Sequence, residues 1–129
     1  MANIVADLYP SNFVTVLPSA ARTATPTDTN EYFVGKARGV TVVIDVTAVT
    51  STPSTTVTIQ GVDRVSGKTW TILASAAIAT VSTVILRVAP GLPAAANVTA
   101  NDLVPPVIRV VASHNNANSM TYSVSVMAS

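Results

Sequence analysis

The sequence predicts an all-β protein: an antiparallel β-sandwich of six to eight strands, with jelly-roll or immunoglobulin-like topology and an extended N-terminal arm. From residue 39 onward, the apolar β-branched residues Val and Ile alternate with Thr, Ser and other polar residues. This is the period-2 pattern of strands that have one buried and one solvated face. Turn residues, among them Pro53, Gly67 and Pro90-Gly91, interrupt the runs at short intervals. Two sheets packed face to face bury such strands, and a barrel is the alternative.

The clearest predicted strand spans residues 39–49. Its buried face is expected to hold Val40, Val42, Ile44 and Val46. Residues 55–62 form the next strand, with Val57 and Ile59 inward and Gly61 marking a bulge. The turn 63–68 then leads into a strand at 69–74, so these two strands are predicted to pair as a hairpin.

Three further strands are predicted at residues 82–88, 106–112 and 120–127. The polar turn SHNNANS favours a second hairpin between the last two, and apolar residues on both faces of 106–112 indicate a central strand. The Ala-rich segment 74–80 is too short for a stable helix and is predicted to be a loop. The long excursion 89–105 is the loop expected to make contacts with partners.

Residues 1–38 differ from the rest, with three prolines and one short apolar stretch. We interpret them as an N-terminal arm or edge strand with a linker, preceding a sandwich domain at 39–129. A strand is possible near 12–17. The linker is a flexible tether, an extended arm that reaches onto a neighbouring subunit, or a surface loop that packs on its own domain. The first ten residues lack a positive segment and a long apolar core, so we expect no signal peptide.

Charge is scarce in this chain of 129 residues: 10% are charged, the net charge is +1 and mean hydropathy is +0.50. Either Thr and Ser cover the wet faces, or neighbouring subunits cover part of the surface, because charge is depleted at interface cores.

Basic residues are scattered singly, which argues against nucleic-acid binding. No apolar run is long enough for a membrane span. The absence of Cys excludes disulfides and thiolate chemistry.

Candidate catalytic groups are few, and we expect no catalytic, cofactor-binding or metal-binding residues. His114 is the single histidine and is interpreted as a solvated turn residue, with a general base or a metal ligand as the alternative. The carboxylates are dispersed and lack calcium-loop spacing. Ser66 lies in VSGK, but no phosphate-loop pattern precedes it. The chain is therefore predicted not to be an enzyme.

Aromatic residues are more easily explained as core and interface anchors than as sugar platforms, and Trp70 is interpreted in this way. Asp45 and Arg109 lie in mid-strand, where each either points into water or meets the other across a sheet or subunit contact. The residues predicted to make interface contacts are Tyr9, Phe13, Tyr32, Phe33 and Arg109.

Residues 39–127 resemble small structural proteins of tailed double-stranded DNA phages. The resemblance lies in VTVVIDVTAVTSTPSTTVTIQGVDRVSGKTWTIL, LRVAPGL and VIRVVASHNNANSMTYSVSV. Similar strings, I-x-V-T-x-V-T-x-T-P-S followed by V-T-I-Q-G-x-D-x-x-S-G-K, recur in proteins encoded among phage head genes. The resemblance implies a virion component, a capsid decoration, cement or minor capsid protein. Such a protein assembles in the host cytoplasm, forms homo-oligomers and contacts a major capsid protein on the capsid surface.

Two alternatives stay open beside that implication. One is a neck or tail structural protein. The other is a carbohydrate- or receptor-binding sandwich, which a solvent-exposed groove combining Trp70, Tyr122 and polar loop groups would favour. Neither reading requires a cofactor or a small-molecule substrate.

Overall fold

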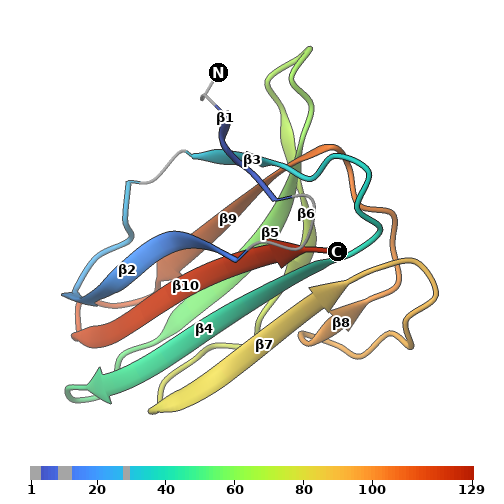
Figure 1. The fold of residues 1–129 in the computed structure, drawn as a ribbon. Helices are drawn as coiled ribbons and strands as arrows, with labels where there is room; N and C mark the ends of the chain where they lie inside the picture. The colour runs from blue at the N-terminus through green and yellow to red at the C-terminus, as the bar shows by residue number, and fades with distance from the viewer. Residues whose placement is uncertain (1–3, 9–12, 28–29) are drawn as a thin grey trace.

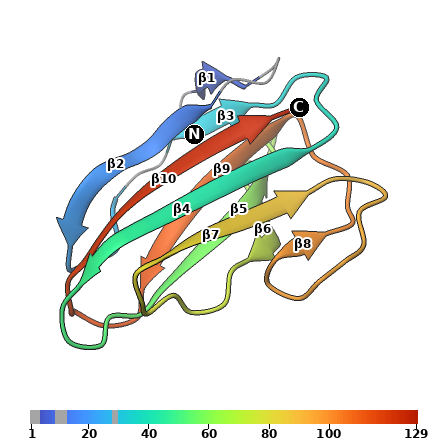
Figure 2. The same cartoon turned by 60° about the horizontal axis from the view of Figure 1, so that its bottom comes forward.

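The chain folds into two five-stranded sheets packed face to face (Figures 1 and 2). The computed structural model describes residues 4–8, 13–27 and 30–129, and these contain ten strands and no helix. The strands are β1 (Ile4–Asp7), β2 (Val14–Arg22), β3 (Glu31–Phe33), β4 (Val40–Val49), β5 (Thr55–Val62), β6 (Thr69–Ala74), β7 (Ser82–Val88), β8 (Thr99–Ala100), β9 (Val107–His114) and β10 (Met120–Ala128). One sheet has the order β1-β3-β9-β5-β6 and the other β2-β10-β4-β7-β8. The predicted all-β sandwich is confirmed.

The topology is that of a jelly roll. When the parallel additions β1 and β8 are set aside, eight strands remain, and they pair as β2 with β10, β3 with β9, β4 with β7, and β5 with β6. The first strand thus pairs with the last, the second with the seventh, and so on inward. A long hairpin wrapped onto itself as two facing sheets produces this order. It selects the jelly roll from the two predicted topologies.

The central strand β4 follows the predicted pattern. Val40, Val42, Ile44 and Val46 are buried, and the residues between them are half-buried or exposed. On the opposite sheet Val57 and Ile59 of β5 are buried as predicted, and β5 and β6 form the predicted antiparallel hairpin. The segment predicted as a loop at 74–80 is one from residue 75 onward, since Ala74 ends β6, and Ile78 joins this loop to Thr55 through an isolated bridge. Alternation therefore predicted both the strands and their buried faces in this part of the chain.

The predicted hairpin between residues 106–112 and 120–127 is wrong. Strand β9 pairs with β3 and β5, whereas β10 pairs with β2 and β4 in the other sheet. The connection 115–119 crosses between the sheets and bonds to the β4–β5 loop, where the Asn115 amide donates to the Ser54 carbonyl at 2.8 Å. Two strands that face each other across a core have the same alternation as two strands of a hairpin, so periodicity does not distinguish the arrangements.

The described part of residues 1–38 contributes strands to both sheets. Strand β2 is the edge of one sheet and pairs with β10, and β3 pairs with β9 in the other. Five residues of this segment lie in the hydrophobic core: Leu8, Val16, Leu17, Tyr32 and Val34. Pro18 lies within β2, a position that an edge strand tolerates because its outer amides need no sheet partner. The described strands of this segment are therefore part of the two sheets of the sandwich.

Candidate functional site

An open groove lies at one end of the β1-β3-β9-β5-β6 sheet, beside the turn that joins β5 to β6. Its volume is about 550 Å³, and its lining is mainly apolar. Four strands, the turn and the segment before β9 contribute its walls: Phe33, Val62, Asp63, Arg64, Trp70, Pro105, Pro106 and Val107. We call this feature the aromatic groove.

Trp70 is placed in the groove by Gly61. The two residues are register partners on β6 and β5, and a Cβ built on Gly61 would lie 2.3 Å from a carbon of the indole ring. The missing side chain lets the ring lie against the β5 backbone, an arrangement that also compensates for the weak packing of a glycine in a strand. Trp70 keeps 47% of its surface exposed. It is therefore a surface aromatic and is not part of the core.

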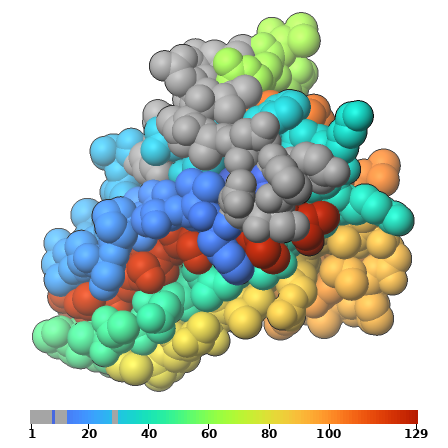
Figure 3. All heavy atoms as spheres, in the orientation of Figure 1, coloured from blue at the N-terminus to red at the C-terminus, as the bar shows by residue number. Residues whose placement is uncertain are grey.

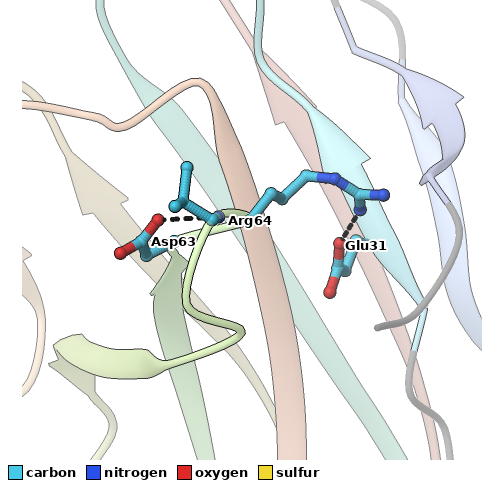
Figure 4. A network of polar contacts seen from close by, with 4 residues as sticks. Glu31, Asp63 and Arg64 are labelled. Atoms are coloured by element: carbon cyan, nitrogen blue, oxygen red, sulfur yellow. Dashed lines mark hydrogen bonds and ion pairs between the residues drawn. The ribbon is translucent and has the colours of Figure 1, made fainter.

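The polar side of the groove is built around Arg64, which reaches from the β5–β6 turn to Glu31 on β3 and forms an ion pair (Figure 4). Only 5% of the Glu31 side chain is exposed, against 34% of Arg64. A carboxylate so thoroughly removed from water needs a charged or hydrogen-bonding partner. The pair thus ties the turn to a strand that lies two places away in the sheet.

Asp63 fixes the shape of the turn. Its carboxylate accepts hydrogen bonds from the Val65 amide at 2.9 Å and the Ser66 hydroxyl at 2.8 Å. These bonds, the Val65 amide first, hold the pKa of Asp63 below its usual range because they stabilise the ionised form. Gly67 completes the turn with a φ of 77°, which a residue with a side chain adopts at a cost.

The predicted interface residues lie in different environments. Phe13 and Phe33 are exposed, and Phe33 lines the aromatic groove. Tyr32 lies in the core with 1% of its surface exposed, so its side chain offers no surface to a partner. Tyr9 lies outside the described residues. Arg109 is half-buried on β9, opposite Gln60 of β5.

Asp45 and Arg109 do not meet within the chain, because they belong to opposite sheets. Asp45 is exposed, and the Thr83 hydroxyl donates to its carboxylate at 3.3 Å. Within this chain Asp45 therefore points outward into water, which is one of the two arrangements that the sequence allowed.

Strands β10, β4 and β7 lie side by side on the face of the molecule that Figure 3 shows, and their outward positions are nearly free of charge. The described residues that point outward from β4, β7 and β10 are Thr41, Val43, Asp45, Thr47, Ala48, Thr83, Ile85, Arg87, Thr121, Ser123, Ser125 and Met127. In this set the charged residues are Asp45 and Arg87. Register places Ser125, Val43 and Ile85 in one row across the middle. We call this surface the uncharged face.

His114 is not the solvated turn residue that the sequence predicted. It ends β9, is half-buried, and its Nε2 lies 2.8 Å from the Tyr122 hydroxyl of the opposite sheet. Burial, followed by the nearby Arg22 guanidinium, lowers the pKa of His114. Burial also raises the pKa of Tyr122, an increase that Arg22 opposes. The overlooked signal is that His114 continues the alternation of Ile108, Val110 and Ala112 into the sandwich.

The described residues contain no group of three or more His, Asp or Glu side chains placed to hold a metal ion. They also contain no helix of the length and apolarity needed to cross a bilayer. The alternative binding module was expected to combine Trp70 and Tyr122 in one exposed groove. Instead Tyr122 is buried in the core, while Trp70 shares the aromatic groove with Phe33.

Comparison of the chain with protein-family models, curated proteins and solved structures finds no match.

Proposed function

We propose that this chain is a non-enzymatic structural protein of a phage virion, of the capsid decoration, cement or minor capsid class, and that it associates with other proteins through the uncharged face. The observation that carries the proposal is the composition of that face, where Thr and Ser surround Val43, Ile85 and Met127. Hydroxyl groups are far cheaper to remove from water than charges are. Interface cores are likewise depleted of charged residues.

The jelly-roll topology supports the same proposal. Viral capsid domains are among the proteins that use this architecture, although lectin domains use it as well. Because one fold hosts many functions, the jelly-roll topology is only compatible with a capsid role. The argument for that role comes from the composition of the uncharged face. The partners that fit are further copies of this chain and a major capsid protein.

The experiment that tests this proposal is to locate the protein in particles. Virions produced from the genome that encodes the chain are purified on a density gradient, and the protein is sought by mass spectrometry and by antibody labelling in electron micrographs. We expect it in every purified particle, in many copies, with label on the head. Label confined to the neck or tail would move the protein to the alternative structural class. Absence from the particles would overturn the proposal.

A second candidate function, a carbohydrate- or receptor-binding module, is supported by the aromatic groove. Trp70 and Phe33 are partly exposed there, beside the polar groups of Asp63 and Arg64. Aromatic rings with one apolar face available stack against sugar rings and other flat ligands. The sequence contains a single Trp, so its fluorescence reports directly on this groove. Titration with a panel of oligosaccharides is expected to shift Trp70 emission if the groove binds sugar. An unchanged spectrum, together with an empty glycan array, would remove this candidate.

A further inference from the structure

The single histidine joins the two sheets at the end of the sandwich opposite the aromatic groove. His114 belongs to β9 and Tyr122 to β10, and the two rings lie 5.7 Å apart between centroids with the Nε2 to hydroxyl contact at 2.8 Å. The backbone of His114 is held by two threonines: Thr55 is its register partner on β5, and the Thr25 hydroxyl accepts a hydrogen bond from the His114 amide at 2.9 Å.

Arg22, the last residue of β2, also packs on Tyr122. Its guanidinium carbon lies 4.8 Å from the centre of the Tyr122 ring. One of its nitrogens donates to the Tyr122 carbonyl at 2.7 Å, and another donates to the Pro18 carbonyl at 2.5 Å. The end of edge strand β2 is therefore held by an arginine that packs on the same tyrosine to which His114 is bonded.

We propose that His114, Tyr122 and Arg22 form an acid-sensitive latch that holds the β2 end of the sandwich closed at neutral pH and loosens it when His114 takes up a proton. Neutral imidazole offers one donor and one acceptor nitrogen, so one tautomer accepts the Tyr122 hydroxyl proton at Nε2. Imidazolium is a donor at both nitrogens. Protonation therefore reverses this hydrogen bond. The Nε2–H group becomes the donor, and the Tyr122 hydroxyl can no longer donate to Nε2 and must accept.

The charges around the ring act in the same direction. Among the described residues, the titratable and charged groups that face His114 are Tyr122 from β10 and Arg22 from β2. No carboxylate of the described residues is among them, so neither of these groups compensates the new positive charge, and Arg22 repels it. The depressed pKa of His114 agrees with this geometry. The segment that should loosen runs from Pro18 to Thr25, because Arg22 and Thr25 attach it to Tyr122 and His114. This inference does not depend on the proposed virion role.

The sign of the pH effect follows from linkage. A base whose pKa is lower in the folded state binds more protons when unfolded, so stability rises with pH across this interval. The contribution of His114 is complete above its unfolded pKa of about 6.5 and is lost as the pH falls through that value toward the folded pKa. Carboxylates titrate mostly below this interval, and the chain has no second histidine.

The test is hydrogen exchange on the full chain between about pH 7.5 and about pH 5, expressed as protection factors that correct for the intrinsic pH dependence of exchange. We expect the wild-type protein to lose protection at residues 18–25 before it loses protection in β5 and β6. His114→Gln, which keeps a neutral hydrogen-bonding amide, is expected to abolish this selective loss. Equal losses in wild type and variant, or a loss spread evenly over both sheets, would overturn the proposal.

A second measurement keeps the inference testable if His114→Gln folds poorly. The single histidine gives an unambiguous NMR titration curve, and Arg22→Gln removes the repelling cation. We expect the wild-type His114 to titrate below its ordinary range and the variant to titrate at higher pH than the wild type. A wild-type pKa at or above the ordinary value would contradict the latch.

Discussion

The indole of Trp70 lies against the backbone of Gly61, its partner across the β5–β6 hairpin, in the space that a side chain at position 61 would fill. Glycine weakens a strand because it has no side chain to pack. Here the aromatic ring from the neighbouring strand fills that space. This contact positions the exposed tryptophan at the aromatic groove.

Gly61→Ala is expected to destabilise the protein by about 1–3 kcal/mol, because the added methyl group would overlap the Trp70 ring. Denaturant unfolding measures the loss, and Trp70 emission should move toward that of a solvated indole as the ring is displaced. Trp70→Ala provides the control. In that background Gly61→Ala should be nearly neutral, and an equal loss in both backgrounds would contradict the packing account.

The Glu31–Arg64 pair should respond unequally to removal of its two partners. Arg64→Met leaves a buried carboxylate without this partner and should cost about 1–3 kcal/mol of stability. Glu31→Gln leaves the more exposed guanidinium, which can turn toward water, and should cost less. Urea denaturation of both single variants and the double variant measures the difference. A larger loss for Glu31→Gln than for Arg64→Met would refute this reading of the burial.

Asp63 should contribute to the acid stability of the β5–β6 turn. Because its folded pKa is lowered, its contribution is present above its unfolded value of 3.8 and is lost as the pH falls through the lower folded value. Asp63→Asn keeps one acceptor for the Val65 amide and loses the second carboxylate oxygen, which accepts from Ser66. We expect the variant to show a weaker pH dependence of the unfolding midpoint below about pH 4. Identical acid profiles for the two proteins would disprove this role.

The two faces of β7 should differ sharply in their tolerance of truncation. Leu86 is completely buried, whereas Thr83 is exposed on the uncharged face. Leu86→Ala is expected to cost about 2–5 kcal/mol, the usual range for a large aliphatic side chain removed from a core. Thr83→Ala should change the free energy of unfolding by less than about 0.5 kcal/mol. Similar losses from both substitutions, measured by thermal and denaturant unfolding, would mean that the faces are assigned incorrectly.

Local alternation predicted the strands β4, β5 and β7 and the buried faces of β4 and β5, because in a half-buried strand the side-chain period is fixed by the backbone. It did not predict which strands pair. The second hairpin was wrong because β9 and β10 carry the same apolar alternation as a hairpin would, while their hydrogen bonds go to β5 and β4.

The candidate sites depend still more on long-range contacts. Strand β3 is too short to give a pattern, yet it brings Glu31 and Phe33 to the groove beside Arg64 and Trp70. His114 was assigned to a turn because polar residues follow it, although its place in the alternation of β9 pointed to the interior. For the uncharged face, the sequence indicates outward Thr positions such as Thr41 and Thr47 of β4, but it does not show which strands share the face, because Thr56 and Thr58 of β5 belong to the opposite sheet.

The central claim is that the uncharged face binds other virion proteins, and a pair of matched variants tests it most directly. Ser125→Asp places a charge in the middle of that face, and Thr58→Asp places the same charge on the outer face of the opposite sheet; both positions are half-buried and lie in central strands. After both variants are found folded by circular dichroism, their copy number in purified particles is measured by quantitative mass spectrometry. The account predicts that Ser125→Asp is lost from particles while Thr58→Asp is incorporated at the wild-type level. Equal incorporation of both variants, or loss of Thr58→Asp alone, would contradict it.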